Sequence, residues 1–293
     1  MTSAQTEKAS SRLRRAGRAR AASTARRAAA YTVLGLLCFL CLFFFYILLI
    51  NATRTHFEIQ RGFSLLPGRS LLTNLKSVLA NANIPVLSGI RNSLLVSALS
   101  ALLSVYFSAL TAYGIHAYDF KFKKLAFTFI LLIMMMPTQV SALGFVRLIT
   151  KMGMADTLAP LFLPSIAAPV VFYFMLQYME GNLPMEIVEA ARIDGSGEFS
   201  TFNRIVLPIL KPALAVQAIF TFVNTWNNYF TPALVLSSSG KILIAQLRSA
   251  DFLKFDMGQV YMMVAIAILP VIAVYLCLSK FIVRGVALGG VKG

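Results

Sequence analysis

The stretch EAARIDGSGEFSTFNRIVLP, residues 189–208, is a short polar segment set between two long apolar runs. Three of the chain's 11 acidic residues lie in it, namely Glu189, Asp194 and Glu198. The flanking runs are long enough to cross a bilayer, because a transmembrane helix needs about 20 mostly apolar residues. The stretch itself is too short and too polar to do so. This contrast predicts a membrane protein with a projecting polar loop.

The composition of the whole chain also favours a membrane protein. Its 293 residues are 58% hydrophobic and 13% charged, whereas soluble domains are about half apolar and about a quarter charged. The net charge is +16, and eight basic residues lie within residues 1–30, directly before the first apolar run. A basic arm can bind nucleic acid, but next to a span it marks the cytoplasmic side and attracts anionic lipid. We therefore expect membrane lipid and no nucleic acid as its partner.

Six apolar runs have the length of a transmembrane helix. They are residues 31–50, 92–116, 125–149, 158–179, 212–236 and 259–283. Pro137 should kink the third, and the recurring serine and alanine of the second should allow close helix packing. An all-α protein with six spans has both termini on one side, which the basic arm makes the cytoplasm. In a bacterial inner membrane, this topology predicts an extracytoplasmic loop at 51–87, a cytoplasmic loop at 181–211 and a cytoplasmic tail at 284–293.

The first half of the cytoplasmic loop has the pattern of a short helix. Asn182 can cap its start, with Pro184 in its first turn. Small or apolar side chains share one helix face, at Leu183, Ile187, Ala190 and Ala191. Gly195 can adopt the left-handed conformation that ends such a helix.

A second short helix should follow this glycine. Ser196 can cap it, and Glu198 lies in its first turn, where the helix dipole favours an acidic side chain. Because Leu207 precedes Pro208, the backbone should leave helical geometry there. A compact helix pair of this kind can dock into a groove on a partner or fold back on its own spans, and the residues alone leave both open.

The spacing of this loop resembles the EAA loop of ABC importer permeases, E-A-A-x3-G-x9-I-x-L-P. The matching residues are Glu189, Ala190, Ala191, Gly195, Ile205, Leu207 and Pro208. The flanking LPMEIVEAARIDGSG, the NSLLVS that opens the second span, and the terminal GVALGGVKG are similar to the carbohydrate branch, the maltose and oligosaccharide permeases. The resemblance covers about residues 88–293 and leaves out the basic arm.

The resemblance implies the six-helix transmembrane domain of a type I ABC importer, with a core at residues 88–283. It implies a coupling helix that sits in a cleft of a dimeric cytoplasmic ATPase, with Glu189 at the contact and Gly195 at the bend. The coupling set is Glu189, Ala190, Ala191, Asp194, Gly195, Ile205, Leu207 and Pro208. A second permease subunit and an extracytoplasmic solute-binding protein complete the importer. ATP and Mg bind the ATPase, this chain binds no cofactor, and the tail at 290–293 either reaches between the ATPase subunits or is a frayed terminus.

The fifth span carries polar side chains that could line a substrate path. Gln217, Thr221, Asn224 and Asn228 share one helix face, Asn227 and Thr231 lie beside it, and Tyr229 is close by. A polar stripe in a span usually faces the bundle interior, and amides with the aromatic Trp226 nearby suit a sugar. The same residues can instead join helices by hydrogen bonds. Thr138 and Gln139 form a second polar cluster after Pro137.

No sequence pattern indicates catalysis by this chain. It lacks the G-x-x-x-x-G-K-[ST] phosphate-binding loop, and its three cysteines and two histidines form no metal or disulfide pattern. We therefore expect a non-enzymatic permease for a sugar or oligosaccharide. The alternatives are a permease of the same superfamily for an amino acid, polyamine or phosphate, and an integral membrane transferase.

Overall fold

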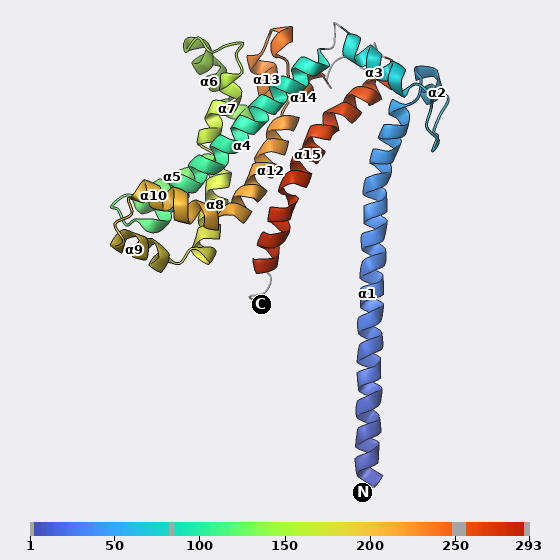
Figure 1. Ribbon diagram of the computed structural model, residues 1–293, viewed down its shortest axis with the longest axis vertical. Coiled ribbons are helices and arrows are strands. Elements are labelled where there is room, and N and C mark those ends of the chain that lie inside the picture. Colours follow the sequence, from blue (N-terminus) through green and yellow to red (C-terminus); the bar gives the residue numbers. More distant parts are fainter. Residues whose placement is uncertain (1–2, 82–84, 248–255, 290–293) are drawn as a thin grey trace.

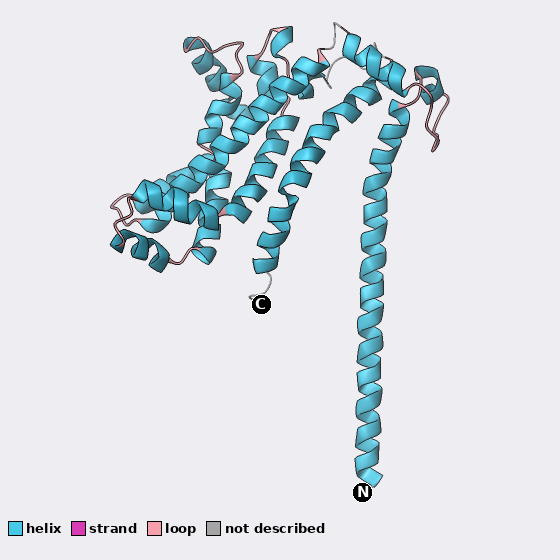
Figure 2. Ribbon diagram, in the orientation of Figure 1, coloured by secondary structure: helices cyan, strands magenta, loops and turns pink. Residues whose placement is uncertain are grey.

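The structure is a computed structural model that describes residues 3–81, 85–247 and 256–289. Every regular element in these residues is helical (Figure 2). The α-helices before the coupling loop are α1 (Ser3–Ala52), α2 (His56–Gln60), α3 (Leu71–Ala80), α4 (Val86–Ala117), α5 (Lys123–Met134), α6 (Thr138–Lys151), α7 (Ala159–Phe162) and α8 (Pro169–Asn182). Those that follow are α9 (Met185–Ile193), α10 (Glu198–Thr201), α11 (Leu207–Ile209), α12 (Lys211–Asn227), α13 (Phe230–Val235), α14 (Ile244–Leu247) and α15 (Met257–Gly289). Short 3₁₀ segments lie at Leu163–Ile166 and Ser239–Lys241, and a π-helix lies at Phe202–Val206.

The helices provide four to six spans, in agreement with the predicted all-α membrane fold. Four helical stretches have the length and apolarity of a span, at residues 26–52, 86–117, 159–182 and 257–280. Two bent pairs of helices bring the number to six when each pair is counted as one span, namely α5 with α6 at 98°, and residues 198–209 with α12 at 81°.

Two predicted spans are wrong as single helices. The third was expected to kink at Pro137, but α5 and α6 are separate helices, because Pro137 is extended (φ −63°, ψ 128°) and proline also restricts the residue before it. The fifth was expected to run to residue 236, but α12 ends at Asn227. Asn228 adopts extended geometry (φ −70°, ψ 115°), and the chain turns into α13.

Helix α4 is the centre of the bundle and packs most extensively on α12 and α8. A serine face runs along it, formed by Ser93, Ser97, Ser100, Ser104 and Ser108, which are all buried. Such small side chains let neighbouring helices approach closely, as the sequence predicted for this span. Larger side chains, including Phe202, Met175 and Met179, fill the core around it.

Leucine at Ser100 should destabilise the fold. Ser100 is fully buried, and its hydroxyl has no hydrogen-bond partner in the described part of the chain. Overpacking a tight contact costs about 1–3 kcal/mol, so we expect Ser100→Leu to lower the thermal unfolding temperature in detergent. Ser100→Ala removes only the unpartnered hydroxyl and should be neutral or slightly stabilising. Equal unfolding temperatures for the leucine and alanine variants would contradict the packing described here.

The two ends of the bundle carry different elements (Figure 1). The start of α1, the end of α15 and the helix α9 lie toward one end, whereas α3, α6, α13 and α14 lie toward the other. Both described chain termini therefore lie toward the same end, as an even number of spans requires. The polar loop lies toward that end as well. Helix α1 contacts α15 near the opposite end and extends beyond the bundle.

Candidate functional site

Helix α9 forms the first part of the polar loop, but it starts later than predicted. Asn182 does not cap it: this residue ends α8, and its Nδ2 donates to the Tyr178 carbonyl at 2.9 Å. Pro184 occupies the cap position with extended backbone (φ −61°, ψ 135°). Leu183 is also extended (φ −118°, ψ 92°) because proline disfavours helical geometry in the residue before it, and this separates α8 from α9.

The predicted apolar face of α9 is divided between core and surface. Val188 and Ala191 are buried against the bundle, whereas Ile187 and Ala190 are exposed. We define the coupling surface as the exposed residues Ile187, Glu189, Ala190, Ile193 and, from α10, Phe199. Ile193 is 86% exposed and Phe199 69% exposed. Large apolar side chains beside a carboxylate at the loop end of the bundle are suited to contact with another protein.

Gly195 terminates α9 as the sequence predicted. Its φ of +76° lies in the left-handed region, which glycine adopts without steric cost. The Gly195 N–H donates to the Arg192 carbonyl at 3.0 Å, and the Ser196 N–H to the Ala191 carbonyl at 2.9 Å. These bonds close the turn and fix the direction in which α10 leaves it. Asp194 immediately precedes the turn and is exposed.

The second helix starts at Glu198, which lies in its first turn as predicted. The predicted cap is wrong: Gly197 occupies the cap position, and the Ser196 hydroxyl instead accepts a hydrogen bond from Thr201 Oγ1 at 2.9 Å.

The prediction that the backbone leaves helical geometry at Leu207 is also wrong. Leu207 is helical (φ −57°, ψ −41°). The π-helix Phe202–Val206 changes the hydrogen-bond register just before Pro208, which then lies in the first turn of α11, where its missing N–H costs nothing. The bend follows at Leu210. Ile205, Leu207 and Pro208 therefore form the elbow between α10 and α12 and are separate from the coupling surface.

A cavity of about 640 Å³ lies toward the opposite end of the bundle. It is lined by residues of α6, α7, the end of α12 and α13, and by Val96 of α4. Hydroxyl and amide groups reach it from Thr138, Ser141, Thr225, Asn228 and Thr231, and aromatic rings from Phe145 and Phe230. None of the described residues that line it is charged.

The predicted polar stripe of the fifth span does not stay together. Of its four members only Asn228 lines the cavity, together with Thr231 from beside the stripe, because α12 ends just before Asn228. Gln217 is buried, Thr221 is half-buried, and Asn224, Asn227 and Tyr229 are exposed.

Trp226 also has a role that the sequence did not indicate. It is 2% exposed and donates from Nε1 to the Ala267 carbonyl at 3.2 Å, so it joins α12 to α15. In the second predicted cluster, Thr138 lines the cavity and Gln139 does not. Ser141 and Thr225 also line the cavity and were not predicted, although Thr225 lies one helical turn after Thr221.

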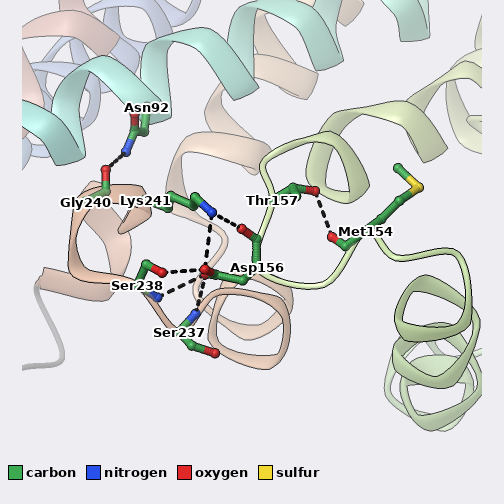
Figure 3. Close-up of polar contacts among 8 residues, drawn as sticks. All are labelled: Asn92, Met154, Asp156, Thr157, Ser237, Ser238, Gly240 and Lys241. Atoms are coloured by element: carbon green, nitrogen blue, oxygen red, sulfur yellow. Dashed lines mark hydrogen bonds and ion pairs between the residues drawn. The ribbon is translucent and has the colours of Figure 1, made fainter.

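A carboxylate joins two loops that adjoin the helices of this cavity (Figure 3). Asp156, between α6 and α7, accepts hydrogen bonds from the Ser237 N–H at 2.9 Å, the Ser238 N–H at 3.0 Å and the Ser238 hydroxyl. Lys241 Nζ lies 3.2 Å from its Oδ2. We call Asp156, Ser237, Ser238 and Lys241 the Asp156 bracket. It ties the α6–α7 loop to the segment after α13, and so connects helices that line the cavity.

Two features show how firmly this region is held. The Asp156 backbone is left-handed (φ 54°), which is uncommon for a non-glycine residue, and its N–H donates to the Val235 carbonyl at 2.9 Å. Asn92 of α4 donates to the carbonyls of Gly240 at 3.0 Å and Ile242 at 3.2 Å.

The Ser238 hydroxyl, two backbone N–H groups and the Lys241 ammonium hold the pKa of the Asp156 carboxyl well below its usual range.

This pKa shift predicts how the bracket responds to pH. A carboxyl with a lower pKa in the folded state stabilises the fold fully above its ordinary pKa, near 3.8, and loses that contribution as pH falls toward the lowered value. Asp156→Asn should therefore lower the unfolding temperature by a constant amount between about pH 8 and pH 5, and the difference should shrink below about pH 4. Asp119→Asn, at an exposed ion pair, is the control. A difference that grows in acid would contradict this assignment.

Comparisons with known proteins agree with this architecture. The family described as "Binding-protein-dependent transport system inner membrane component" matches residues 104–288. The arabinooligosaccharides transport system permease protein AraQ of Bacillus subtilis (strain 168) is 36% identical over 209 residues, which cover 69% of this chain and 72% of that protein. The trehalose/maltose transport system permease protein MalG of Thermococcus litoralis is 29% identical over 239 residues, 79% of this chain and 85% of that one.

A solved structure shares the fold. It is the crystal structure of a bacterial ABC transporter involved in the import of the acidic polysaccharide alginate, and one of its chains aligns with a TM-score of 0.74 at 19% identity. The alignment covers 86% of this chain and 94% of that one. The chain therefore belongs to the binding-protein-dependent transport system inner membrane components: it is a multi-pass permease, a transport component and not an enzyme, that works with an ATPase and a solute-binding protein.

Proposed function

We propose that this permease imports a neutral sugar or oligosaccharide and that the cavity forms part of its path. The observation that carries the proposal is the cavity lining, whose described residues combine five hydroxyl or amide side chains with two phenylalanine rings and include no charged group. Sugar hydroxyls need hydrogen bonds, and the C–H faces of a sugar ring pack on aromatic side chains. An amino acid, a polyamine or phosphate carries charge, and burying that charge without a partner is costly.

The relatives support the same substrate class. Their names refer to arabinooligosaccharides, to trehalose and maltose, and to lactose. The relative that transports sn-glycerol-3-phosphate shows that the family also accepts a charged solute. The neutral lining distinguishes these cases, because a phosphate would favour a basic side chain in the wall.

We further propose that the coupling surface docks into a dimeric cytoplasmic ATPase, where ATP and Mg bind. Glu189 and the apolar Ile193 and Phe199 project from the bundle at the end that both described termini share. This assignment makes that end cytoplasmic, in agreement with the basic arm. A second, different permease completes the path, and the arm contacts anionic lipid. The tail at 290–293, which could reach the ATPase, lies outside the described residues.

An integral membrane transferase is the weaker alternative. In the described residues, no group of three or more His, Cys, Asp or Glu side chains could hold a metal ion. The cavity also presents no carboxylate, imidazole or thiol to act on a bound substrate. The family match to transport components favours passage of the solute over its modification.

The proposal can be tested with proteoliposomes that contain both permeases, the ATPase and the solute-binding protein. Uptake of labelled maltose and arabino-oligosaccharides should depend on ATP, whereas labelled glutamate, spermidine and phosphate should stay at background. ATP-dependent uptake of one of the charged solutes, with none of the sugars, would overturn the substrate assignment.

A further inference from the structure

An ion pair connects the two helices of the polar loop to the end of α4. The Arg192 Nε–H, in the last turn of α9, donates to Glu198 Oε1 at 2.7 Å. The hydroxyl of Tyr113, on α4, donates to Glu198 Oε2 at 2.9 Å. The Glu198 carboxylate therefore uses one oxygen for α9 and the other for α4. None of these three residues belongs to the seven-position E-A-A-x3-G-x9-I-x-L-P spacing.

Further contacts fix the orientation of this group. The Arg192 guanidinium lies over the Tyr118 ring, 5.1 Å from its centroid, and its Nη2 lies 3.5 Å from the Ala117 carbonyl at the end of α4. Tyr113 is 3% exposed, and its ring centroid lies 5.6 Å from that of Phe202. The arginine is therefore held on two sides, and the tyrosine cannot turn away from Glu198 without leaving the core.

Helix α4 connects these contacts at the polar loop to the helices that line the cavity. Helix α9 also touches the bundle through Val188 and Ala191, whose apolar contacts have no preferred direction. Hydrogen bonds to a carboxylate are directional and resist sliding. Helix α4 packs along α12 and α8, and both α4 and α12 contribute residues to the cavity. A rigid connection at Glu198 thus joins the coupling surface to the helices of the path.

We propose that Glu198, held by Arg192 and Tyr113, is a positioning residue that transmits motion of the docked α9 into α4. The inference rests on the proposed docking of an ATPase on the coupling surface and adds a role for residues outside that surface. The Arg192 and Glu198 side chains are 33% and 42% exposed, and a pair this exposed contributes little to folding stability. Loss of the connection should therefore change coupling much more than folding.

Glu198→Gln and Tyr113→Phe, in the complete complex in proteoliposomes, test this role. Both variants should retain the ATPase in wild-type amounts and unfold within a few degrees of wild type. Sugar uptake per ATP hydrolysed should fall by about fivefold or more, the range typical of coupling between sites. Asp119→Asn breaks an exposed ion pair with Lys123 (3.1 Å) in the α4–α5 connection and should leave the ratio unchanged.

The outcomes separate this inference from the proposed function. Unchanged uptake per ATP in both variants would overturn it. Loss of the ATPase from Glu198→Gln would also overturn it, because the residue would then act in docking. A wild-type complex that binds no ATPase would instead contradict the proposed function.

Discussion

Replacing Glu189 by lysine is expected to release the ATPase from the complex. Glu189 is an exposed member of the coupling surface, and its carboxylate makes no hydrogen bond or ion pair in the described part of the chain. It is therefore available to a basic group on a partner. Reversing a charge at a docked interface removes a favourable ion pair and adds a repulsion between like charges. We therefore expect ATPase retention to fall by about tenfold or more. Quantitative co-purification with a tagged permease measures this loss.

Asp119→Lys is the matched control for this variant. It makes the same change of charge at a fully exposed side chain in the connection between α4 and α5, and Asp119 is not one of the residues that define the coupling surface. ATPase retention should stay at the wild-type level. Equal losses for the two variants would show that net charge, and not the α9 contact, controls assembly.

Phenylalanine at position 144 is expected to block transport without disturbing assembly. Gly144 lies on α6 and lines the cavity, and a Cβ added there meets open space. A benzyl group can therefore enter the cavity without backbone strain and occupy the space that a sugar needs. We expect ATP-dependent uptake to fall by about tenfold or more, since a misfit of even one methylene in a pocket costs about 1–3 kcal/mol.

The alanine variant of the same residue controls for the loss of glycine. Gly144→Ala adds one methyl group to open space and should support α6, since alanine is the better helix former by about 1 kcal/mol. Its uptake should resemble wild type. Full uptake by Gly144→Phe, with the ATPase still bound, would exclude the cavity from the path.

The sequence predicted the turn between the two helices of the coupling loop, but not their caps or the side of α9 that is buried. The glycine at position 195 correctly predicted the turn, because the turn requires only a left-handed backbone conformation there. The rotation of α9 about its axis could not be predicted in the same way. Val188 is buried because it packs in the core cluster that contains Phe202 and Tyr113, and these contacts are remote in sequence. The sequence indicated a bend near Pro137, but the 98° angle depends on how α5 and α6 pack.

The cavity was less predictable than the loop. Its polar groups come from α6, α12 and α13, and the stripe on the fifth span was assigned as if that helix were continuous. The Asn228 side chain stabilises the turn after α12: its Nδ2 donates to Thr231 Oγ1 at 3.2 Å, and its Oδ1 accepts from the Thr231 N–H at 3.3 Å. Neither glycine nor proline marks the break at this residue. The Asp156 bracket joins residues about eighty positions apart, a pairing that no local pattern encodes.

The most direct test of the central claim is a cross-link from the coupling surface to the ATPase. Ile193, which is 86% exposed, is replaced by cysteine in a chain without Cys38, Cys41 and Cys277, and the complex is treated with a short bifunctional thiol and amine reagent. Phe57 in α2, which is 73% exposed at the opposite end of the bundle, is the control position. We predict that residue 193 cross-links to the ATPase and that residue 57 does not. No cross-link from residue 193 in a complex that contains the ATPase would contradict the docking of α9.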